Sequence, residues 1–174
     1  MSLRRLERDF FEQNTVEVAQ NLLGKIMVFQ NFKGIIFETE AYRGNDDPAS
    51  HAHRGSTPRT QVMFERGGIS YVYFIYGMYH CLNFVTEREG APGAVLIRGL
   101  QLLEPEPKVL EGPGKICRHL FLTKEHHGID VVQSDSFYLL EDLDFKKIEY
   151  ASTSRTGIQK GKEKLWRFVI DVPK

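Results

Sequence analysis

The chain has 174 residues, a length that predicts one domain, residues 1–174, with a substantial hydrophobic core. No run of about 18 apolar residues occurs, which excludes a membrane-spanning helix. The 23 basic side chains are balanced by 23 acidic ones, so overall charge gives no support for nucleic-acid binding. The distribution is uneven, however, because residues 101–150 carry more acids than bases and residues 151–174 carry the reverse. We therefore expect a polarised surface.

The cysteine content indicates the compartment. Cys81 and Cys117 are the only cysteines, and they are far apart in the sequence. Such sparse use is typical of a reducing environment, where both thiols pack in the core. The N-terminus lacks the apolar stretch of a secretory signal. We therefore expect a cytoplasmic protein.

Capping residues, turn residues and apolar alternation predict the elements in chain order. Thr15 is the candidate N-cap of a helix that continues to Leu23 and ends at Gly24. The later expectations are strands at 25–30 and 35–42 around a turn at 31–34, a loop at 43–58, a helical turn at 59–64, a hairpin within 71–85, a strand at 94–102, a loop at 105–114, a helix from 115 to 122, and strands at 137–141 and 165–172. Many strands with few helices predict an α+β fold with a curved, mainly antiparallel sheet and flanking helices.

The predicted hairpin is unusually aromatic. Its sequence, YVYFIYGMYHCLNFV at residues 71–85, holds six aromatic residues, and Gly77 interrupts it near the middle. Aromatic and β-branched residues favour strands, and the glycine favours a tight turn between them. Aromatic rings and a methionine at the tip of a protruding hairpin normally need a partner. We infer that this partner is DNA.

The strand at 35–42, IIFETEAY, contains two glutamates. Because side chains alternate along a strand, Glu38 and Glu40 share one face with Ile36 and Tyr42, with Cα atoms of the two glutamates about 7 Å apart. The opposite face, predicted to be the core side, holds Ile35, Phe37, Thr39 and Ala41. The glutamates belong either to a half-solvated face or to a buried functional pair.

Arg98 is the expected partner of these carboxylates. It is the one charged residue in the apolar strand AVLIRGL at 94–100. A neighbouring guanidinium holds a carboxylate ionised, whether the pair is a structural salt bridge or part of a catalytic site.

Several motifs occur together in a characteristic order. They are ETEAY at 38–42, His51, TPR at 57–59, YVYFIYGMYHCLN at 71–83, VLIRGL at 95–100, GPGK at 112–115, RTG at 155–157 and LWRF at 165–168. Over nearly the whole chain this set resembles the alkyladenine DNA glycosylase family, also called 3-methyladenine DNA glycosylases. The resemblance implies a single-domain enzyme without a cofactor that removes damaged bases from double-stranded DNA. Such an enzyme must first extrude the target nucleotide from the helix.

The resemblance also implies catalytic and base-binding roles. Glu40 matches the general base that activates a water molecule, and Arg98 matches the arginine that keeps this base ionised. The flipped base lies in a slot with Tyr42 and His51 on one side and Tyr73 on the other. Two further positions complete the implied pocket, namely Ala49 in its wall and Asn83, which crowds the amino group of guanine.

The DNA contacts implied by the resemblance come from the hairpin and from basic residues. Tyr76 matches the wedge that fills the gap left in the duplex, flanked by Met78 and Tyr79. The candidate phosphate contacts are Thr57, Arg59 and Lys115, the last in a turn similar to that of a helix-hairpin-helix element. No lysine nucleophile is implied, so we expect base release without strand cleavage.

Other functions fit parts of the sequence. A single-stranded nucleic-acid-binding module with an aromatic sheet explains the tyrosines but not Glu40 beside Arg98. A glycoside hydrolase would use Glu38 and Glu40 as an acid–base pair, but no sugar platform separates them. We expect no metal site, because no third ligand is spaced near the adjacent His126 and His127. The expected partner is double-stranded DNA with damaged bases, bound by a monomer.

Overall fold

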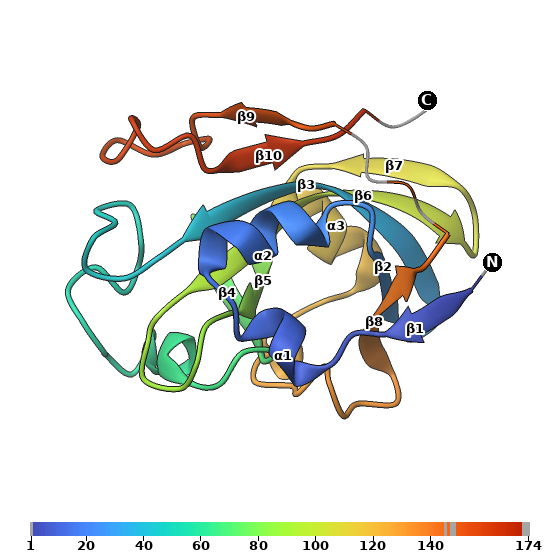
Figure 1. The fold of residues 1–174 in the computed structure, drawn as a ribbon, viewed down its shortest axis with the longest axis horizontal. Coiled ribbons are helices and arrows are strands. Elements are labelled where there is room, and N and C mark those ends of the chain that lie inside the picture. The colour runs from blue at the N-terminus through green and yellow to red at the C-terminus, as the bar shows by residue number, and fades with distance from the viewer. Residues whose placement is uncertain (1, 145, 147–148, 172–174) are drawn as a thin grey trace.

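The computed structural model describes residues 2–144, 146 and 149–171. Within these residues, ten strands form one sheet in which every pairing between neighbouring strands is antiparallel (Figure 1). The strands are β1 (Leu3–Arg5), β2 (Ile26–Phe29), β3 (Phe32–Tyr42), β4 (Ser70–Ile75), β5 (Tyr79–Val85), β6 (Ala94–Glu104), β7 (Lys108–Glu111), β8 (Phe137–Asp142), β9 (Ala151–Thr153) and β10 (Arg167–Val169). The helices are α1 (Arg8–Phe11), α2 (Thr15–Leu22) and α3 (Pro113–Leu120), with short 3₁₀ segments η1 (Gln61–Phe64) and η2 (Lys124–His126). The predicted α+β class is confirmed.

The long strand β3 organises the sheet. One of its edges pairs with β6 over most of its length. The other edge pairs first with β2, where Ile35 lies opposite Ile26, and then with β10, where Glu40 lies opposite Arg167. Figure 1 shows β10, together with β9, lying alongside β3. The second half of β3 therefore lies in the interior of the sheet, between β6 and β10.

The two pairing strands β3 and β6 do not keep a constant register. The register shifts around Phe37 on β3 and around Arg98 on β6. An extra residue in a strand interrupts strict alternation. The predicted alternation was therefore wrong for Ile36, which is fully buried in the same core cluster as Phe37. Glu38 and Glu40 do lie on one side, because the Nε atom of Arg98 is 3.8 Å from a carboxylate oxygen of each.

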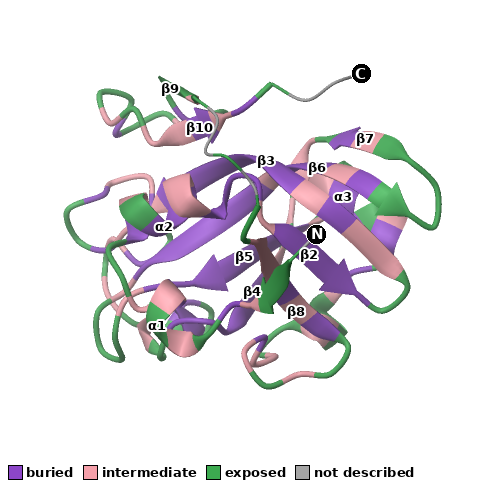
Figure 2. Cartoon of the chain, turned by 45° about the vertical axis from the view of Figure 1, so that its right-hand side comes forward, coloured by how far each residue is buried: buried purple, intermediate pink, exposed green. Residues whose placement is uncertain are grey.

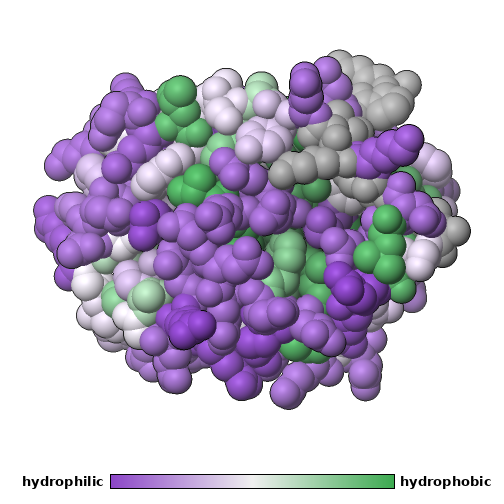
Figure 3. Space-filling view, in the orientation of Figure 1, coloured by the Kyte–Doolittle hydropathy of each residue, from purple (hydrophilic) through white to green (hydrophobic). Residues whose placement is uncertain are grey.

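The main core lies between the sheet and the helices packed on it. Helix α2 packs on β3, and α3 packs on β5 and β6. The strands β2 and β3 are largely buried, whereas the connecting loops are exposed (Figure 2). The surface seen in Figure 3 is mainly hydrophilic, with hydrophobic side chains in small separate patches. Among the described helices, none has the length and apolar character needed to cross a membrane.

Several predicted boundaries differ from the structure. Asn14 rather than Thr15 caps α2, because its side chain accepts a hydrogen bond from the Val16 amide at 2.9 Å. Thr15 is instead buried, and its hydroxyl bonds to the Glu87 carboxylate. The predicted loop at 105–114 contains β7 and the start of α3, and the last predicted strand is shorter, with residue 172 outside the described residues. The strands β1 and β9 and the helix α1 were not predicted.

The aromatic segment folds as two paired strands. Strand β4 pairs with β5, and the last pair, Ile75 with Tyr79, leaves a three-residue turn between them. Tyr76 and Gly77 in this turn have positive φ angles of 56° and 62°. A bulky residue rarely adopts such a φ, so the turn geometry, rather than the local preference of tyrosine, sets this conformation. Tyr76 is 76 % exposed and Met78 is 69 % exposed.

Candidate active site

A cavity of about 640 Å³ lies beside the second half of β3. Its walls come from the end of β3, the loop that follows, the paired strands β4 and β5, the start of α3, and residues 156–160. The structure thus brings together most of the residues predicted from the sequence, namely Tyr42, Ala49, His51, Tyr73, Tyr76, Tyr79, Asn83, Arg98 and Lys115. Met78 lines a second hollow of about 250 Å³, which Tyr79 shares.

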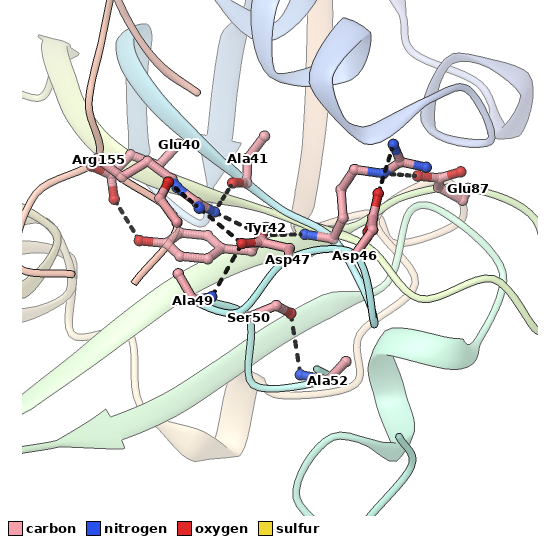
Figure 4. Close-up of polar contacts among 12 residues, drawn as sticks. Glu40, Ala41, Tyr42, Asp46, Asp47, Ala49, Ser50, Ala52, Glu87 and Arg155 are labelled. Atoms are coloured by element: carbon pink, nitrogen blue, oxygen red, sulfur yellow. Dashed lines mark hydrogen bonds and ion pairs between the residues drawn. The ribbon is translucent and has the colours of Figure 1, made fainter. Parts of the chain in front are cut away.

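Glu40 lies directly behind the wall of this cavity. Its side chain is fully buried. One carboxylate oxygen accepts a hydrogen bond from the Tyr42 hydroxyl at 2.8 Å (Figure 4). The other accepts one from the Thr156 backbone amide at 2.6 Å. Tyr42 and Thr156 both line the cavity, so both residues that hydrogen-bond to the carboxylate belong to the cavity wall.

The charge state of Glu40 is set by opposing effects. Burial, with a smaller contribution from the charge of Glu38, raises the pKa of Glu40 above its usual range. Arg98 and the hydrogen bonds from Thr156 and Tyr42 act in the opposite direction and offset part of this rise. A carboxylate with a raised pKa is a stronger base than an exposed one, which suits general-base chemistry near neutral pH.

Arg98 lies close to both glutamates without a direct hydrogen bond from its Nε atom. That atom is 3.8 Å from the nearest oxygen of each carboxylate. It is buried and has no hydrogen-bond partner among the residues that the structure describes. Because a buried donor without a partner is costly, this N–H is available to a molecule bound between Arg98 and Glu40.

Glu38 has a different environment from Glu40. Its Oε2 atom accepts hydrogen bonds from Nε and Nη2 of Arg167 at 3.1 and 2.8 Å, and Arg167 also donates to Thr153. Glu38 does not line the cavity. It therefore joins β3 to β10 through Arg167, which lies outside the cavity lining, whereas Glu40 is bonded to two lining residues. The two carboxylates do not face the cavity as a pair, which argues against the glycoside hydrolase alternative.

The predicted base slot differs from the structure in one respect. The rings of His51 and Tyr73 touch edge to face, with centroids 4.7 Å apart and planes at 78°. The edge of one ring thus meets the face of the other, and the slot that the resemblance implies is not open between these two rings in this arrangement. The His51 Nδ1 atom also lies 3.0 Å from the Tyr71 hydroxyl, a contact that fixes the imidazole ring.

The ionisation of the aromatic wall is set mainly by burial. Burial, helped by the charge of Arg59, lowers the pKa of His51, so its imidazole is neutral at pH 7. Burial raises the pKa of both Tyr42 and Tyr73, so their hydroxyls stay protonated. Tyr42 therefore acts as a hydrogen-bond donor towards Glu40.

The remaining predicted residues lie in three different settings. Asn83 is buried, and its amide nitrogen donates to the Tyr71 carbonyl at 3.1 Å, which fixes the side chain in the cavity wall. Thr57 lies outside the cavity lining, and its hydroxyl accepts a hydrogen bond from the Thr60 amide at 3.2 Å. Arg59 also lies outside the lining and is exposed, with its guanidinium 5.6 Å from the centre of the Tyr73 ring. Within the described ranges, no cluster of His, Cys, Asp or Glu could hold a metal ion.

The C-terminal part of the chain contributes groups around Glu40 that were not predicted from the sequence. The Thr156 contact is made by a backbone amide, which leaves no trace in residue type. Asp47 and Arg155 form a fully buried ion pair at 2.7 Å across 108 residues of sequence. The RTG motif at 155–157 was the only available signal, and it did not indicate a partner.

Comparison with known proteins assigns the family. The sequence profile of the methylpurine-DNA glycosylase family matches residues 9–174. A relative from Wolbachia sp. subsp. Brugia malayi is 56% identical over 165 residues, which cover 95% of this chain and 96% of the relative. A relative from Sodalis glossinidius is 53% identical over 163 residues, which cover 94% and 95% of the two chains. Both relatives carry the provisional name 3-methyladenine DNA glycosylase. The resemblance seen in the motifs is thus confirmed, and the chain belongs to the methylpurine-DNA glycosylase family.

Proposed function

We propose that the protein is a monofunctional DNA N-glycosylase that flips alkylated or deaminated purines out of duplex DNA and hydrolyses their N-glycosidic bonds. Such an enzyme initiates base excision repair. The observation that carries the proposal is the fully buried Glu40 beside a cavity of about 640 Å³, a volume that suits a small-molecule group such as a nucleotide.

In the proposed reaction, Glu40 is the general base. Each carboxylate oxygen has two lone pairs, so Glu40 can accept a water molecule in addition to its bonds from Tyr42 and Thr156. The free Nε–H of Arg98 orients the same water. The water oxygen bonds to the anomeric carbon, the bond from that carbon to the base breaks, and the water proton passes to Glu40. Positioned proton transfer of this kind contributes about 10²–10⁴-fold to the rate.

The proposed base recognition uses the aromatic wall. Tyr42, His51 and Tyr73 present ring surfaces on which a purine stacks, and alkylation at a ring nitrogen makes many such bases cationic. Because the His51 imidazole is neutral, it adds no like charge against a cationic base. Electron-rich rings attract that base further. Asn83, fixed by its bond to Tyr71, crowds the amino group of guanine.

Substitution Glu40→Gln tests this proposal. We expect base release from an alkylated duplex to fall by about 10²–10⁴-fold while binding of the duplex survives, because glutamine keeps the shape but cannot accept the proton. The measurement is single-turnover release of the modified base, together with a binding titration.

The matched control is Glu38→Gln, the same change two residues away on the same side of β3. We expect it to retain most of the activity, because the Glu38 carboxylate is hydrogen-bonded to Arg167, outside the cavity lining, whereas that of Glu40 is hydrogen-bonded to Tyr42 and Thr156 in the lining. Base release by Glu40→Gln at the unsubstituted rate would remove Glu40 from the mechanism. Equal losses in both variants would revive the paired-carboxylate alternative.

A second assay separates the enzyme from the binding-module alternative. A duplex containing hypoxanthine or ethenoadenine is incubated with the protein, with and without subsequent alkali. The proposal predicts strand scission only after alkali, because the enzyme leaves an intact abasic strand. Scission without alkali would assign a lyase role to a cavity lysine such as Lys115 or Lys160. Tight single-strand binding without any scission would favour the module.

A further inference from the structure

Arg155 and Asp47 form an ion pair that is withdrawn from solvent. Two guanidinium nitrogens of Arg155 lie 2.7 and 2.8 Å from the two carboxylate oxygens of Asp47, and neither side chain is exposed (Figure 4). Although burial alone would raise it, the pKa of Asp47 is held below its usual value by the bonds from Arg155. Desolvation offsets most of the attraction in a buried pair, so stability alone explains the pair poorly.

On the Asp47 side, the pair fixes one wall of the cavity. The Asp47 carboxylate also accepts hydrogen bonds from the backbone amides of Arg43 at 2.9 Å and Ala49 at 3.2 Å. These bonds set the path of residues 43–49, which carry Pro48 and Ala49 into the cavity lining.

On the Arg155 side, the pair fixes a second part of the cavity wall. Arg155 donates to the Ala41 carbonyl at 2.9 Å and to the Gly161 carbonyl at 3.4 Å. The segment between, residues 156–160, lines the cavity. Gly161 has a φ of 75°, and a Cβ atom there would lie 2.9 Å from an Arg155 nitrogen, so the close approach at this position requires glycine.

Both hydrogen bonds to Glu40 come from groups that Arg155 touches or adjoins. The Arg155 guanidinium lies 4.8 Å from the centre of the Tyr42 ring and 5.2 Å from that of Trp166. The Tyr42 hydroxyl is one donor to Glu40, and the amide of Thr156, the next residue in the chain, is the other.

We propose that Arg155 and Asp47 are positioning residues for catalysis: their buried pair clamps the two cavity walls together and holds Tyr42 and the Thr156 amide against Glu40. This proposal rests on the proposed role of Glu40 as general base. Neither residue lines the cavity, so both act through the groups that they hold.

Loss of the Arg155–Asp47 clamp should change the pH dependence of base release, an effect that loss of a purely structural ion pair would not have. The charged and titratable groups around Glu40 are Glu38 and Tyr42 on β3, Arg98 on β6, Arg167 on β10 and Tyr73 on β4. Among the hydrogen bonds to Glu40, those from Thr156 and Tyr42 lower its pKa. Without these two hydrogen bonds, fewer interactions counteract the effect of burial on the pKa of Glu40, so this pKa rises further. The pH below which activity falls then moves upward.

The test uses two variants of the full chain. Asp47→Asn removes the charge and keeps the shape. The double variant Asp47→Leu with Arg155→Met replaces the whole pair by apolar side chains, an exchange that is often tolerated by the fold. For both we expect single-turnover base release to fall by about 10²-fold, the scale of loss from a small misplacement of catalytic groups. We also expect the acidic limb of the pH profile to move to higher pH, and unchanged affinity for undamaged duplex.

A matched control is Asp130→Asn, which breaks a partly buried ion pair. In this pair the Nη2 atom of Arg8 lies 2.5 Å from Oδ2 of Asp130, and neither residue lines the cavity. We expect its rate and pH profile to match those of the unsubstituted protein, and thermal unfolding checks that each variant is folded. Two results would overturn the clamp: a folded double variant with the unsubstituted rate and profile, or a rate loss that is uniform at every pH. If the unsubstituted protein itself released no base, the proposed function would fail instead.

Discussion

At the scale of single residues, the most informative group is Glu40, a carboxylate without solvent contact whose nearest cationic atom is 3.8 Å away. Glu38, by contrast, is bonded directly to a cation, with a nitrogen of Arg167 2.8 Å from its carboxylate. Glu40 instead receives hydrogen bonds from a neutral hydroxyl and a backbone amide, which orient it without cancelling the effect of burial. This combination keeps the group basic.

The raised pKa of Glu40 predicts the pH dependence of base release. In the proposed mechanism Glu40 acts in its deprotonated form, so we expect activity above its pKa and a loss of activity as the pH falls through that value. Because the pKa of Glu40 lies above that of an exposed glutamate, the rate of base release begins to fall at a higher pH than it would with an exposed glutamate. Well below this pKa, the rate falls by about tenfold per pH unit. Single-turnover rates over a pH series measure this limb.

A control for the pH series is Tyr42→Phe, which removes a hydrogen bond that lowers the pKa of Glu40. The limb should move to higher pH in this variant. A limb at the position of an ordinary glutamate, unchanged by Tyr42→Phe, would contradict the assignment of Glu40 as the titrating base.

At the scale of elements, the paired strands β4 and β5 present Tyr76 at their turn, the most exposed large side chain of the hydrophobic set within the described residues. Tyr76 has a positive φ in this turn and is part of the cavity lining. A ring so placed can fill the space of a nucleotide that has left the duplex and entered the cavity.

The wedge role predicts an asymmetric effect of Tyr76→Ala. Losing one stacked ring removes about 1–3 kcal/mol, so release of a lesion in a correct pair should fall by about 5- to 150-fold. Release of the same lesion in a mispair should fall less, because mispaired bases leave the helix more easily. Single-turnover release from the two duplexes measures the ratio.

Phe74 provides the control for this comparison, since it is an exposed ring on β4 that packs with His80 and lies outside the cavity lining. Phe74→Ala should affect both duplexes little. Equal losses on paired and mispaired lesions in Tyr76→Ala would count against the wedge.

Elements with strong local signals could be predicted from the sequence. Alternation and aromatic content located β3 and the β4–β5 pair, and apolar spacing located α2. The short strands β1 and β9 could not be predicted from the sequence, because their own residues carry little strand signal and their structure depends on pairing with neighbouring strands. In β1, for example, Arg5 pairs with Leu140 of β8. The bulge at Phe37 was also hidden, since it depends on the register with β6.

The site was predictable to a similar degree and for similar reasons. Glu40 and Arg98 stand out because charged residues are rare in such apolar strands, and the motif order supplied their expected roles. Thr156 could not be found, because its contact is a backbone amide. Asp47 and Arg155 looked like ordinary loop charges until the fold brought them together.

At the scale of the whole molecule, balanced charge means that any attraction to DNA must come from local basic groups. Arg59 and Lys115 are both exposed, and Lys115 lies in the cavity lining. If each neutralises one phosphate, the logarithm of the binding constant should fall with the logarithm of salt concentration with a slope of about −0.9 for each contact.

Substitution Lys115→Gln should therefore reduce the steepness of the salt dependence by about 0.9. Titrations of a lesion-containing duplex at several salt concentrations measure this slope. Lys33→Gln is the control, because Lys33 pairs with Glu104 at 3.7 Å and lies outside the cavity lining. A binding constant insensitive to salt would contradict a phosphate-contacting surface, and equal slopes for both variants would exclude Lys115 from it.

The pairing of β3 with β10 has a consequence for the protein while it is being synthesised. Domains begin to fold while the ribosome is still translating them, from the N-terminus onwards. A nascent polypeptide translated only to residue 150 already contains Glu40, Arg98 and the aromatic strands, but not the Thr156 amide or Arg167. Its Glu40 carboxylate would lack the hydrogen bond from the Thr156 amide and the pairing of β3 with β10, so we expect an unfinished polypeptide to lack the proposed activity.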